Sequence, residues 1–322
     1  MTGPVVVAGN LSLDDTITPD GSFGAAPGGD ALYASIAVRS WGLVPVLLTL
    51  VGDDYPESDL ARIASAEIDV GRVRRTDGPT VHYRVTYRTD AYRTFEWISS
   101  PDRLLLTSPT AYDYDALVGA SWLHVAAMPI EAQEVGVAAA RAAGVPVSLD
   151  PHEEYIIGFE PRLAAMVADV TFMPSELEAR LLFPDLASLE ALAFGFAAAE
   201  RLDAWRPSLT AIKLGAIGSV VRRAGRSIHI PAPAVPVVDP TGAGDAYCGG
   251  FVAGWLATRS PEVAGGCGAI AASEAIGAFG AFPSGRPDRQ ARFDQLVALL
   301  GDRVESAHLE AVRNQLWTGT AS

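Results

Sequence analysis

Short runs rich in valine and leucine alternate along this chain with longer alanine-rich segments, and this alternation restricts its fold more than any other feature. The run “VVVAG” precedes “DALYASIAVRSWG”, “VPVLLTLVG” precedes “ESDLARIASAE”, and “SWLHVAA” precedes “IEAQEVGVAAARAAG”. Repeated strand–helix pairs are typical of βαβ units, in which helices cover both faces of a mostly parallel sheet. With 322 residues, 49% of them hydrophobic, the chain can bury such a core. We expect an α/β fold, a three-layer α/β/α sandwich in one domain over residues 1–322.

The segment 80–99 departs from this alternation. Its sequence, “TVHYRVTYRTDAYRTFEWIS”, alternates apolar and polar residues around a polar turn and has no helical partner. This pattern predicts an antiparallel hairpin outside the main sheet. A second hairpin is expected at “LTAIKLGAIGSVVRRAGRSIHIPA”, and the chain after Gly244 has helical spacing.

The charge balance restricts the partners of the chain. The formal net charge is -14 and the isoelectric point is about 4.7. Such a surface repels phosphate backbones and anionic lipid headgroups, so we expect neither a nucleic acid nor a membrane as partner. The two cysteines form no CxxC motif, and the N-terminus has no basic segment typical of a signal peptide. These features predict a cytoplasmic protein.

The stretch “VVDPTGAGDAYCGGF”, residues 237–251, places a glycine turn between an expected strand, “VPVV”, and an expected helix. Unpaired amides at a helix start, together with the helix dipole, favour an anion. Asp245 then lies in the first helical turn, where a carboxylate with a pKa near ~3.9 is ionised and accepts a proton from an attacking hydroxyl. Taken alone, the four residues Gly-Ala-Gly-Asp are more typical of a simple helix cap.

The longer pattern is more specific, because an aspartate precedes the threonine by two residues and a Gly-Gly pair follows in the helix. It resembles the C-terminal signature of the ribokinase-like carbohydrate kinases of the PfkB family. The resemblance implies transfer of a phosphoryl group from ATP in the presence of Mg²⁺. It also implies that Asp245 is the catalytic base and that the amides of Gly242, Ala243 and Gly244 stabilise the transferring group.

Near the N-terminus, “GNLSLD” and “APGGDALYASIAVRSWGL” are similar to the first strand and the Gly-Gly signature of the same family. Tyr33 stands where many members have asparagine, and Asp30 lies inside the motif, so the acceptor pocket is expected to differ from that of ribokinase. Asp14 alone would also fit an ordinary residue at a strand end. By the resemblance, the acceptor site comprises six residues: Asn10, Asp14, Gly28, Gly29, Asp30 and Tyr33.

Three further motifs resemble the nucleotide and cation sites of the family. In “FMPSELEARLL”, Glu178 matches the family's Asn-x-x-Glu element and Ser175 replaces the asparagine, which implies Mg²⁺ held through water. “KLGAIG” is similar to the nucleotide-side turn and implies ATP contacts from Lys213, Gly215 and Gly218, with Thr241. Taken alone, these motifs would indicate an exposed helix glutamate and a hairpin glycine pair. “AIGAFGAFPSG” resembles a loop that surrounds K⁺, and the implied K⁺ site comprises Asp239, Thr241, Ala275, Ala278, Gly280 and Ser284.

The expected function is phosphorylation of a hydroxymethyl group on a small sugar. The chain has no G-x-x-x-x-G-K-[ST] motif, which argues against a P-loop mechanism. The resemblance also implies that the hairpin in residues 80–99 and neighbouring N-terminal strand segments form a small lid. One alternative is a nucleoside kinase of the same fold, in which Tyr33 and lid aromatics stack on a base. Another is a sugar- or nucleotide-binding regulatory protein that has lost turnover.

His152 follows a strand end and is either a ligand or a solvated loop residue. The lid strands are also expected to join two copies of the chain in a homodimer. The lid aromatics are Tyr83, Tyr87, Tyr92, Phe95 and Trp97.

Overall fold

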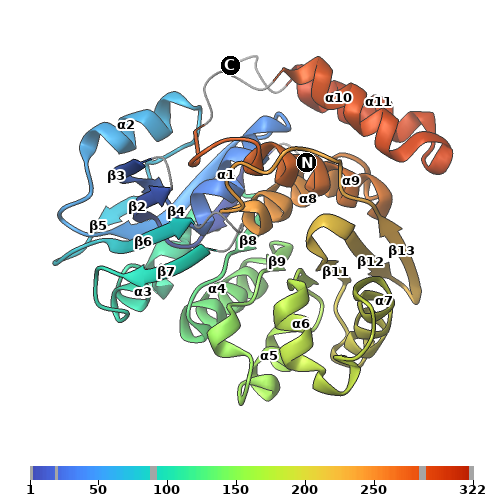
Figure 1. The fold of residues 1–322 in the computed structure, drawn as a ribbon, viewed down its shortest axis with the longest axis horizontal. Coiled ribbons are helices and arrows are strands. Elements are labelled where there is room, and N and C mark those ends of the chain that lie inside the picture. Colours follow the sequence, from blue (N-terminus) through green and yellow to red (C-terminus); the bar gives the residue numbers. More distant parts are fainter. Residues whose placement is uncertain (1–2, 19–20, 88–92, 283–287, 319–322) are drawn as a thin grey trace.

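The computed structural model describes residues 3–18, 21–87, 93–282 and 288–318, and it confirms the expected α/β fold (Figure 1). Its main sheet has nine strands in the order β13-β12-β11-β10-β9-β8-β1-β4-β5. The strands from β11 to β5 run parallel, and β12 and β13 form an antiparallel edge, which is the expected second hairpin. The strands are β1 (Val5–Ala8), β4 (Pro45–Val51), β5 (Val73–Arg75), β8 (Trp122–Val125), β9 (Val147–Leu149), β10 (Thr171–Phe172), β11 (Leu209–Lys213), β12 (Ser219–Arg223) and β13 (Arg226–Ile230).

Helices cover both faces of this sheet. Successive side chains of a strand point to opposite faces, so Val5 and Val7 of β1 join one hydrophobic cluster and Val6 and Ala8 join the other. The first cluster includes side chains of α1 (Asp30–Ser40), α2 (Glu57–Ser65), α8 (Ala243–Thr258), α9 (Pro261–Ile276), α10 (Arg289–Leu300) and α11 (Ser306–Thr318). The second includes side chains of α4 (Ile130–Ala143), α5 (Glu160–Val167), α6 (Glu176–Leu182) and α7 (Ala191–Leu202).

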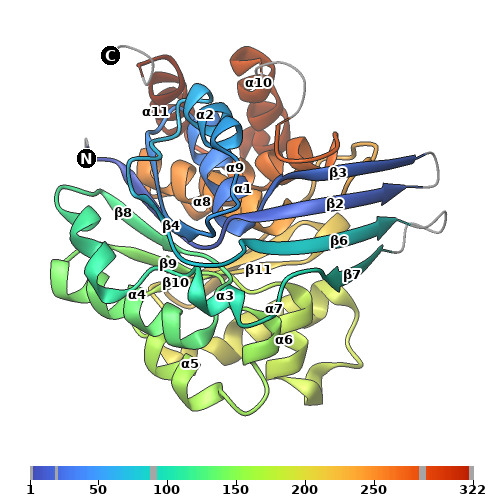
Figure 2. The ribbon, with the colours of Figure 1, turned by 90° about the vertical axis from the view of Figure 1, so that its left-hand side faces the viewer.

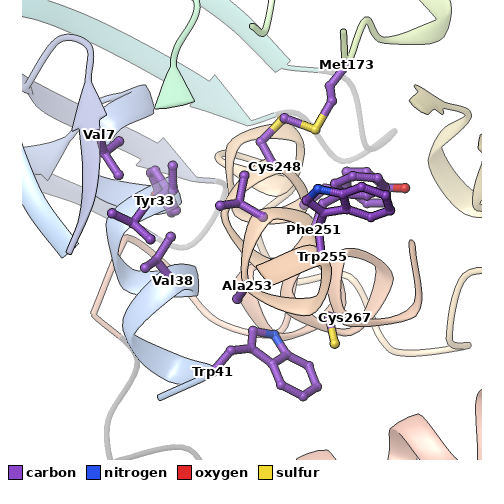
Figure 3. Packing of buried hydrophobic residues seen from close by; sticks show 14 of the residues in the cluster. Val7, Tyr33, Val38, Trp41, Met173, Cys248, Phe251, Ala253, Trp255 and Cys267 are labelled. Carbon is purple, nitrogen blue, oxygen red and sulfur yellow. The ribbon is translucent and has the colours of Figure 1, made fainter. Parts of the chain in front are cut away.

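Helix α8 is the central helix of the first layer and is buried from Ala246 to Trp255. Figure 3 shows α8 beside Tyr33 and Val38 of α1 and beside Trp41, the residue after α1, with its own Phe251 and Trp255 on the side away from Tyr33. A Cβ at Gly249 would lie 2.2 Å from the carbonyl oxygen of Ala34, and one at Gly250 would lie 2.6 Å from that of Cys267. The Gly-Gly pair of the signature therefore lets α1 and α9 pack closely against α8.

The lid is a separate four-stranded sheet, in the order β3-β2-β6-β7, that extends beyond the sandwich (Figure 2). The expected hairpin in residues 80–99 is confirmed as β6 (Val81–Tyr87) and β7 (Arg93–Trp97). It is joined by the N-terminal hairpin of β2 (Ser12–Thr18) and β3 (Gly21–Gly28), with β2 parallel to β6. Because β2 and β3 lead into α1, the lid is connected directly to the sandwich.

The expected strand at residues 235–238 is wrong. Residues 231–242 have no regular secondary structure, and β13 ends at Ile230. Prolines occupy positions 231, 233, 236 and 240, and a proline has no amide hydrogen with which to pair in a sheet. The amide of Val238 donates to the carbonyl oxygen of Ile276 instead, which fixes this segment against the end of α9.

The helices expected in the C-terminal part are confirmed as α9, α10 and α11. Across the described ranges of the chain, no helix combines the length and the apolar character needed to cross a membrane.

Candidate active site

The candidate site lies at the carboxyl ends of the parallel strands, which is where open α/β sheets bind ligands. Asp150 follows β9, Lys213 ends β11, and Asn10 follows β1. The N-terminus of α8 reaches the same region, because the Nζ atom of Lys213 lies 3.4 Å from the position of a Cβ on Gly244. The topology therefore brings together motifs that are far apart in the sequence.

The glycine turn before α8 is held from two sides. Gly242 is the N-cap, with a φ of 74°, and a Cβ there would lie 2.2 Å from the Tyr33 ring, so only glycine fits. The carboxylate of Asp239 accepts a hydrogen bond from the Thr241 amide at 2.8 Å. Since the first amides of a helix have no intrahelical acceptor, this turn offers its N–H groups to an anion. Asp245 lies in the first turn of the helix that follows.

Two cavities meet at this turn. The first has a volume of about 480 Å³ and a mostly apolar lining, and the second, more open, has a volume of about 520 Å³. Lys213, Gly215 and Gly244 line both, and Gly218 lines the first. An apolar cavity that ends at exposed helix amides suits a nucleotide, with the base in the first cavity and the phosphates at Gly244. The apolar lining includes Ala232, Pro233, Val235, Val237, Ala269, Ala272 and Ile276.

Ser175 and Glu178 form a capping box at the start of α6. The Ser175 amide donates to Oε2 of Glu178 at 2.5 Å, and the Glu178 amide donates to Oγ of Ser175 at 3.3 Å. Burial raises the pKa of the Glu178 carboxyl, while the Lys213 ammonium opposes this rise. Serine thus keeps the helix cap that asparagine would also supply, and Ser175 lines the open cavity.

Among the described residues no three His, Cys, Asp or Glu side chains form a cluster that could hold a metal ion. The carboxylates of Asp150 and Asp245 lie close enough to repel each other, and that of Glu178 also repels Asp150. An excess of carboxylates without a complete set of protein ligands fits a Mg²⁺ ion that is bound mainly by phosphate oxygens and water.

The acceptor side is formed by β2, β3 and the start of α1. Oδ1 of Asp14 accepts a hydrogen bond from the Ser12 hydroxyl at 2.8 Å, and a Cβ at Gly28 would lie 2.0 Å from its Oδ2. Burial is the main cause that raises the pKa of Asp14 to about 6. At Gly29 φ is 103°, and a Cβ there would lie 2.3 Å from the carbonyl oxygen of Asn10. Gly28 therefore lets the backbone approach the Asp14 carboxylate, and Gly29 lets it approach the main chain of Asn10.

Asp30 is the first residue of α1, and its Oδ1 accepts hydrogen bonds from the amides of Asn10, at 2.7 Å, and Ala31, at 2.5 Å. Burial raises its pKa well above the ordinary value, and the charge of Asp245 adds to this rise. Asp30 therefore fixes the start of α1 while its carboxylate lies near the predicted base.

Two residues that the sequence assigns to the acceptor, Asn10 and Tyr33, also have structural contacts. The side-chain amide of Asn10 donates to the carbonyl oxygen of Leu104, at 3.0 Å, and to the hydroxyl of Thr107, at 2.9 Å, which links β1 to α3 (Arg103–Leu106). Tyr33 is only 5% exposed and packs against Gly242, so its ring supports the glycine turn and has little surface for stacking on a base.

The lid contributes one aromatic pair near the acceptor side. The ring centroids of Tyr83 and Trp97 lie 4.4 Å apart. Burial raises the pKa of Tyr83, and the charges of Asp30 and Asp14 add to the rise, which places this tyrosine near both carboxylates. Tyr92 and the side chains of Tyr87 and Phe95 lie outside the described residues.

His152 lies in the loop after β9. Its Nδ1 accepts a hydrogen bond from the Glu154 amide at 3.2 Å and caps a short turn, and burial lowers its pKa. This contact gives His152 a local role in the loop.

Several residues of the predicted K⁺ site lie next to one another. Oδ2 of Asp239 accepts a hydrogen bond from the Gly280 amide at 3.2 Å, and the Asp239 amide donates to the carbonyl oxygen of Ile276. The end of α9, which contains Ala275, and the loop with Ala278 and Gly280 therefore lie beside Asp239 and Thr241, whereas Ser284 lies outside the described residues.

Asp150 is a site residue that the sequence analysis missed. It is 3% exposed, and its Oδ2 accepts hydrogen bonds from the Lys213 ammonium, at 2.5 Å, and from the Cys248 thiol, at 3.3 Å. The signal in the sequence was an aspartate immediately after the apolar strand “VSL”, at the strand end where ligands bind. Its partner is 63 residues away, so no local pattern marks the pair.

Known proteins with similar sequences are carbohydrate and nucleoside kinases. The family model described as pfkB family carbohydrate kinase matches residues 6–288. A cytidine kinase from Thermococcus kodakarensis is 29% identical over 268 residues, which cover 80% of this chain and 90% of that protein. A fructokinase from Klebsiella pneumoniae is 28% identical over 311 residues, which cover 88% of this chain and 97% of that protein.

Solved structures share the fold at lower sequence identity. A structure of Arabidopsis thaliana ribokinase, complexed with ribose and ATP, aligns with a TM-score of 0.73 and 21% identity over 92% of this chain and 99% of that chain. Adenosine kinase from Sinorhizobium meliloti aligns with a TM-score of 0.74 and 21% identity over 91% of this chain and 99% of that chain. These alignments establish the fold alone.

Proposed function

The chain belongs to the pfkB family of carbohydrate kinases and is an ATP-dependent phosphotransferase, and we propose that its acceptor is the hydroxymethyl group of a small, uncharged sugar. The observation that carries the proposal is the position of the turn from Gly242 to Asp245. On one side the turn borders the nucleotide cavity through Gly244, and on the other it borders the acceptor side, where Asp245 is close to Asp30.

The side chains suggest a role for each group in the transfer. Asp245 accepts the proton of the acceptor hydroxyl, whose oxygen forms a bond with the γ-phosphorus while the bond from that phosphorus to the leaving oxygen of ADP breaks. The amides of Gly242, Ala243 and Gly244 stabilise the charge on the transferring group. Asp14 orients the acceptor by accepting hydrogen bonds from two of its hydroxyls. Mg²⁺, held by phosphate oxygens and water beside Glu178 and Ser175, supplies further neutralisation of charge when bound.

The charge of the acceptor side supports an acceptor without a phosphate group. Asp30 lies near Asp245, and Tyr83 lies near both Asp14 and Asp30, so the acceptor side carries several carboxyl groups. Among the described side chains of the lid, the basic residues His82 and Arg84 have acidic partners, since His82 lies 3.2 Å from Asp15 and Arg84 lies 3.1 Å from Glu96. A phosphorylated sugar would meet like charges, which cost several kcal/mol when they are brought together at a binding site.

We therefore expect kcat/KM for fructose 6-phosphate to be about 100-fold lower than for the best unphosphorylated sugar, because this charge repulsion opposes binding. The release of ADP in a coupled assay measures both rates, with ribose, fructose and glucose as the unphosphorylated sugars. A phosphorylated sugar that reacts as fast as the best free sugar would contradict the proposed acceptor class.

A nucleoside is the second candidate acceptor, and the Tyr83–Trp97 pair favours it. Aromatic rings beside the acceptor carboxylates offer a stacking surface to a base. The cytidine kinase among the similar proteins agrees with this candidate. Values of kcat/KM for cytidine and adenosine, compared with those for ribose and fructose, separate the two acceptor classes.

The lid is expected to close over the acceptor and to exclude water from the reacting hydroxyl. Amides in β6 and β7 should then exchange hydrogen more slowly when sugar and a non-hydrolysable ATP analogue are bound together than when the analogue is bound alone. Hydrogen–deuterium exchange with mass spectrometry measures this difference, and the strands β8 and β9 of the buried sheet serve as an internal control. Equal exchange of β6 and β7 in both states would argue against closure.

A K⁺ ion is proposed near the anion-binding turn, held by carbonyl oxygens of the loop that follows α9 and by Asp239 and Thr241. The contact between Asp239 and Gly280 supports it, because it brings that loop to the turn. A turnover rate that is the same in KCl and in choline chloride would rule out a functional K⁺ site.

A homodimer through the lid is also proposed. The lid sheet ends in two open strands, β3 and β7, and an open strand edge is able to pair with another chain. Sedimentation velocity that gives only a monomer at micromolar concentration would contradict this proposal.

We further propose a cytoplasmic location, with which the two free, buried cysteines agree.

A further inference from the structure

The buried ion pair between Lys213 and Asp150 lies within the candidate site and has no part in the mechanism described above. Lys213 is the single lysine of the sequence. Its Nζ lies 2.5 Å from Oδ2 of Asp150, and the two side chains are 11% and 5% exposed. Strand β10 lies between β9 and β11, so the pair spans the carboxyl end of the sheet. An ion pair this deeply buried gains little net stability, because both charges lose their hydration.

The ammonium group is placed at the phosphate end of the nucleotide cavity. Lys213 lines both cavities and lies next to Gly244 in the glycine turn. Of the residues that line these cavities, Arg180 is the other basic one, and its guanidinium is engaged by Glu176, by the carbonyl oxygens of Ala187 and Leu189, and by the Phe194 ring. Lys213 is therefore the cation that can reach a phosphate without breaking several other contacts.

Lys213 keeps its charge in this environment. Burial alone would lower the pKa of its ammonium, but the neighbouring Asp150, Cys248 and Glu178 raise the pKa above the ordinary lysine value. For Asp150, burial is the larger cause and raises the pKa of the carboxyl, while the Lys213 ammonium opposes this rise. A permanent positive charge is thus held among three carboxylates, those of Asp150, Glu178 and Asp245, and next to amides that accept an anion.

The contacts of Asp150 allow the ammonium to leave it. Oδ1 of Asp150 is buried and has no hydrogen-bond partner within the described residues, while the Cys248 thiol donates to Oδ2. The side-chain amide of Gln133 donates a hydrogen bond to the main-chain carbonyl oxygen of Asp150 at 2.6 Å and fixes the backbone there. The carboxylate therefore stays in place, and keeps a donor, when the ammonium turns towards another anion.

We propose that Asp150 is a positioning residue that holds the Lys213 ammonium beside Gly244, and that this ammonium turns to the phosphate oxygens of the nucleotide during transfer. The inference rests on the proposed function. No proton leaves Lys213: Asp245 takes the proton of the acceptor, the new oxygen–phosphorus bond forms, the bond to the ADP oxygen breaks, and the ammonium neutralises the charge that builds on the leaving oxygen.

Binding to nucleotides of different charge tests the contact with phosphate. In Lys213→Met the affinity for adenosine should stay unchanged, while the affinities for ADP and for a non-hydrolysable ATP analogue should fall about 30-fold, because a charge-assisted contact is lost. Isothermal titration calorimetry measures all three. Arg180→Met is the matched control, since Arg180 lines the same cavity but is held elsewhere, and its nucleotide affinities should stay within about threefold of the wild type.

Lys213→Arg keeps the charge and should retain the affinity for ADP within about threefold, which separates loss of charge from loss of folding. Equal weakening of adenosine and ADP in Lys213→Met, or no weakening of ADP, would overturn the assignment of the ammonium to the phosphates.

Turnover tests the positioning role of Asp150. In Asp150→Asn we expect kcat to fall about tenfold with the KM for ATP within about threefold of the wild type, because the asparagine oxygen still accepts a hydrogen bond from Lys213 but holds it less firmly. If Asp150 acts through Lys213, Asp150→Asn should cause no further loss in the Lys213→Met background. A further tenfold loss in the double variant would overturn the positioning role.

The proposed kinase function and the proposed contact of Lys213 with phosphate are refuted by different results. A wild-type protein that binds ADP through Lys213 but phosphorylates no acceptor would refute the proposed function and leave the phosphate contact intact. A wild-type protein that turns over normally, with ADP binding indifferent to Lys213→Met, would refute the inference alone.

Discussion

Replacing Asp245 with asparagine is expected to lower kcat by about 10²- to 10⁴-fold, which is the range that general-base assistance usually contributes. The melting temperature should stay close to that of the wild type. Asparagine is accepted near a helix start almost as well as aspartate, and the side chain lies in the first turn of α8. A loss of turnover without a loss of stability identifies a carboxylate that acts in the chemistry.

Asp288 supplies a matched control for this variant. It caps α10 by accepting hydrogen bonds from the amides of Gln290, at 2.8 Å, and Ala291, at 3.3 Å. Asp288→Asn makes the same chemical change at a helix start outside the site, so its kcat should equal that of the wild type. Near-normal turnover in Asp245→Asn, measured beside this control, would exclude the carboxylate from the mechanism.

Replacing Asp14 with asparagine is expected to lower kcat/KM for the acceptor by about 10²- to 10³-fold, because two charge-assisted hydrogen bonds to acceptor hydroxyls are lost. The KM for ATP should stay nearly unchanged, since the nucleotide cavity has no contribution from Asp14. Steady-state kinetics with each substrate varied in turn measures the difference. An equal effect on both substrates would contradict the assignment of Asp14 to the acceptor.

The same substitution should stabilise the protein, and this gain should depend on pH. Burial raises the pKa of Asp14 from 3.8 to about 6, so the native state binds its proton more tightly than the unfolded state does. The contribution of this group to stability is therefore greatest below pH 3.8 and falls as the pH rises to about 6. Asp14→Asn should raise the free energy of unfolding by about 3 kcal/mol at pH 8 and by about half of that at pH 5. Urea unfolding at both pH values measures the gain, and a variant less stable than the wild type at pH 8 would contradict it.

The layers of the fold were predictable because their signals are local. Apolar strands followed by alanine-rich helices indicate βαβ units wherever they occur, and the hairpin in residues 80–99 follows from its two-residue period. The strand expected at residues 235–238 failed for an equally local reason. The valines on both sides of Pro236 suggested a strand. The prolines of that segment, however, remove amides that a sheet requires.

The parts of the site that depend on distant pairs could not be predicted. Tyr33 packs on Gly242, more than two hundred residues further along the chain, and no local pattern predicts that its ring supports the glycine turn. In the sequence, Asp150 is a single acidic residue after a strand. Only the order of the strands in the sheet shows that Lys213 lies beside it. The glycine turn itself was predictable, because the residues that form it are consecutive in the sequence.

The central claim is that the enzyme transfers the γ-phosphoryl group of ATP to an acceptor hydroxyl at Asp245. The most direct test supplies the wild-type enzyme with ATP labelled with ¹⁸O at the three non-bridging γ-oxygens, together with a panel of free sugars and nucleosides, and analyses the products by mass spectrometry. One phosphorylated sugar or nucleoside that carries all three heavy oxygens should form in amounts equal to ADP, and it should form at least about 100-fold more slowly with Asp245→Asn. Release of labelled inorganic phosphate with no phosphorylated acceptor across the panel would contradict it.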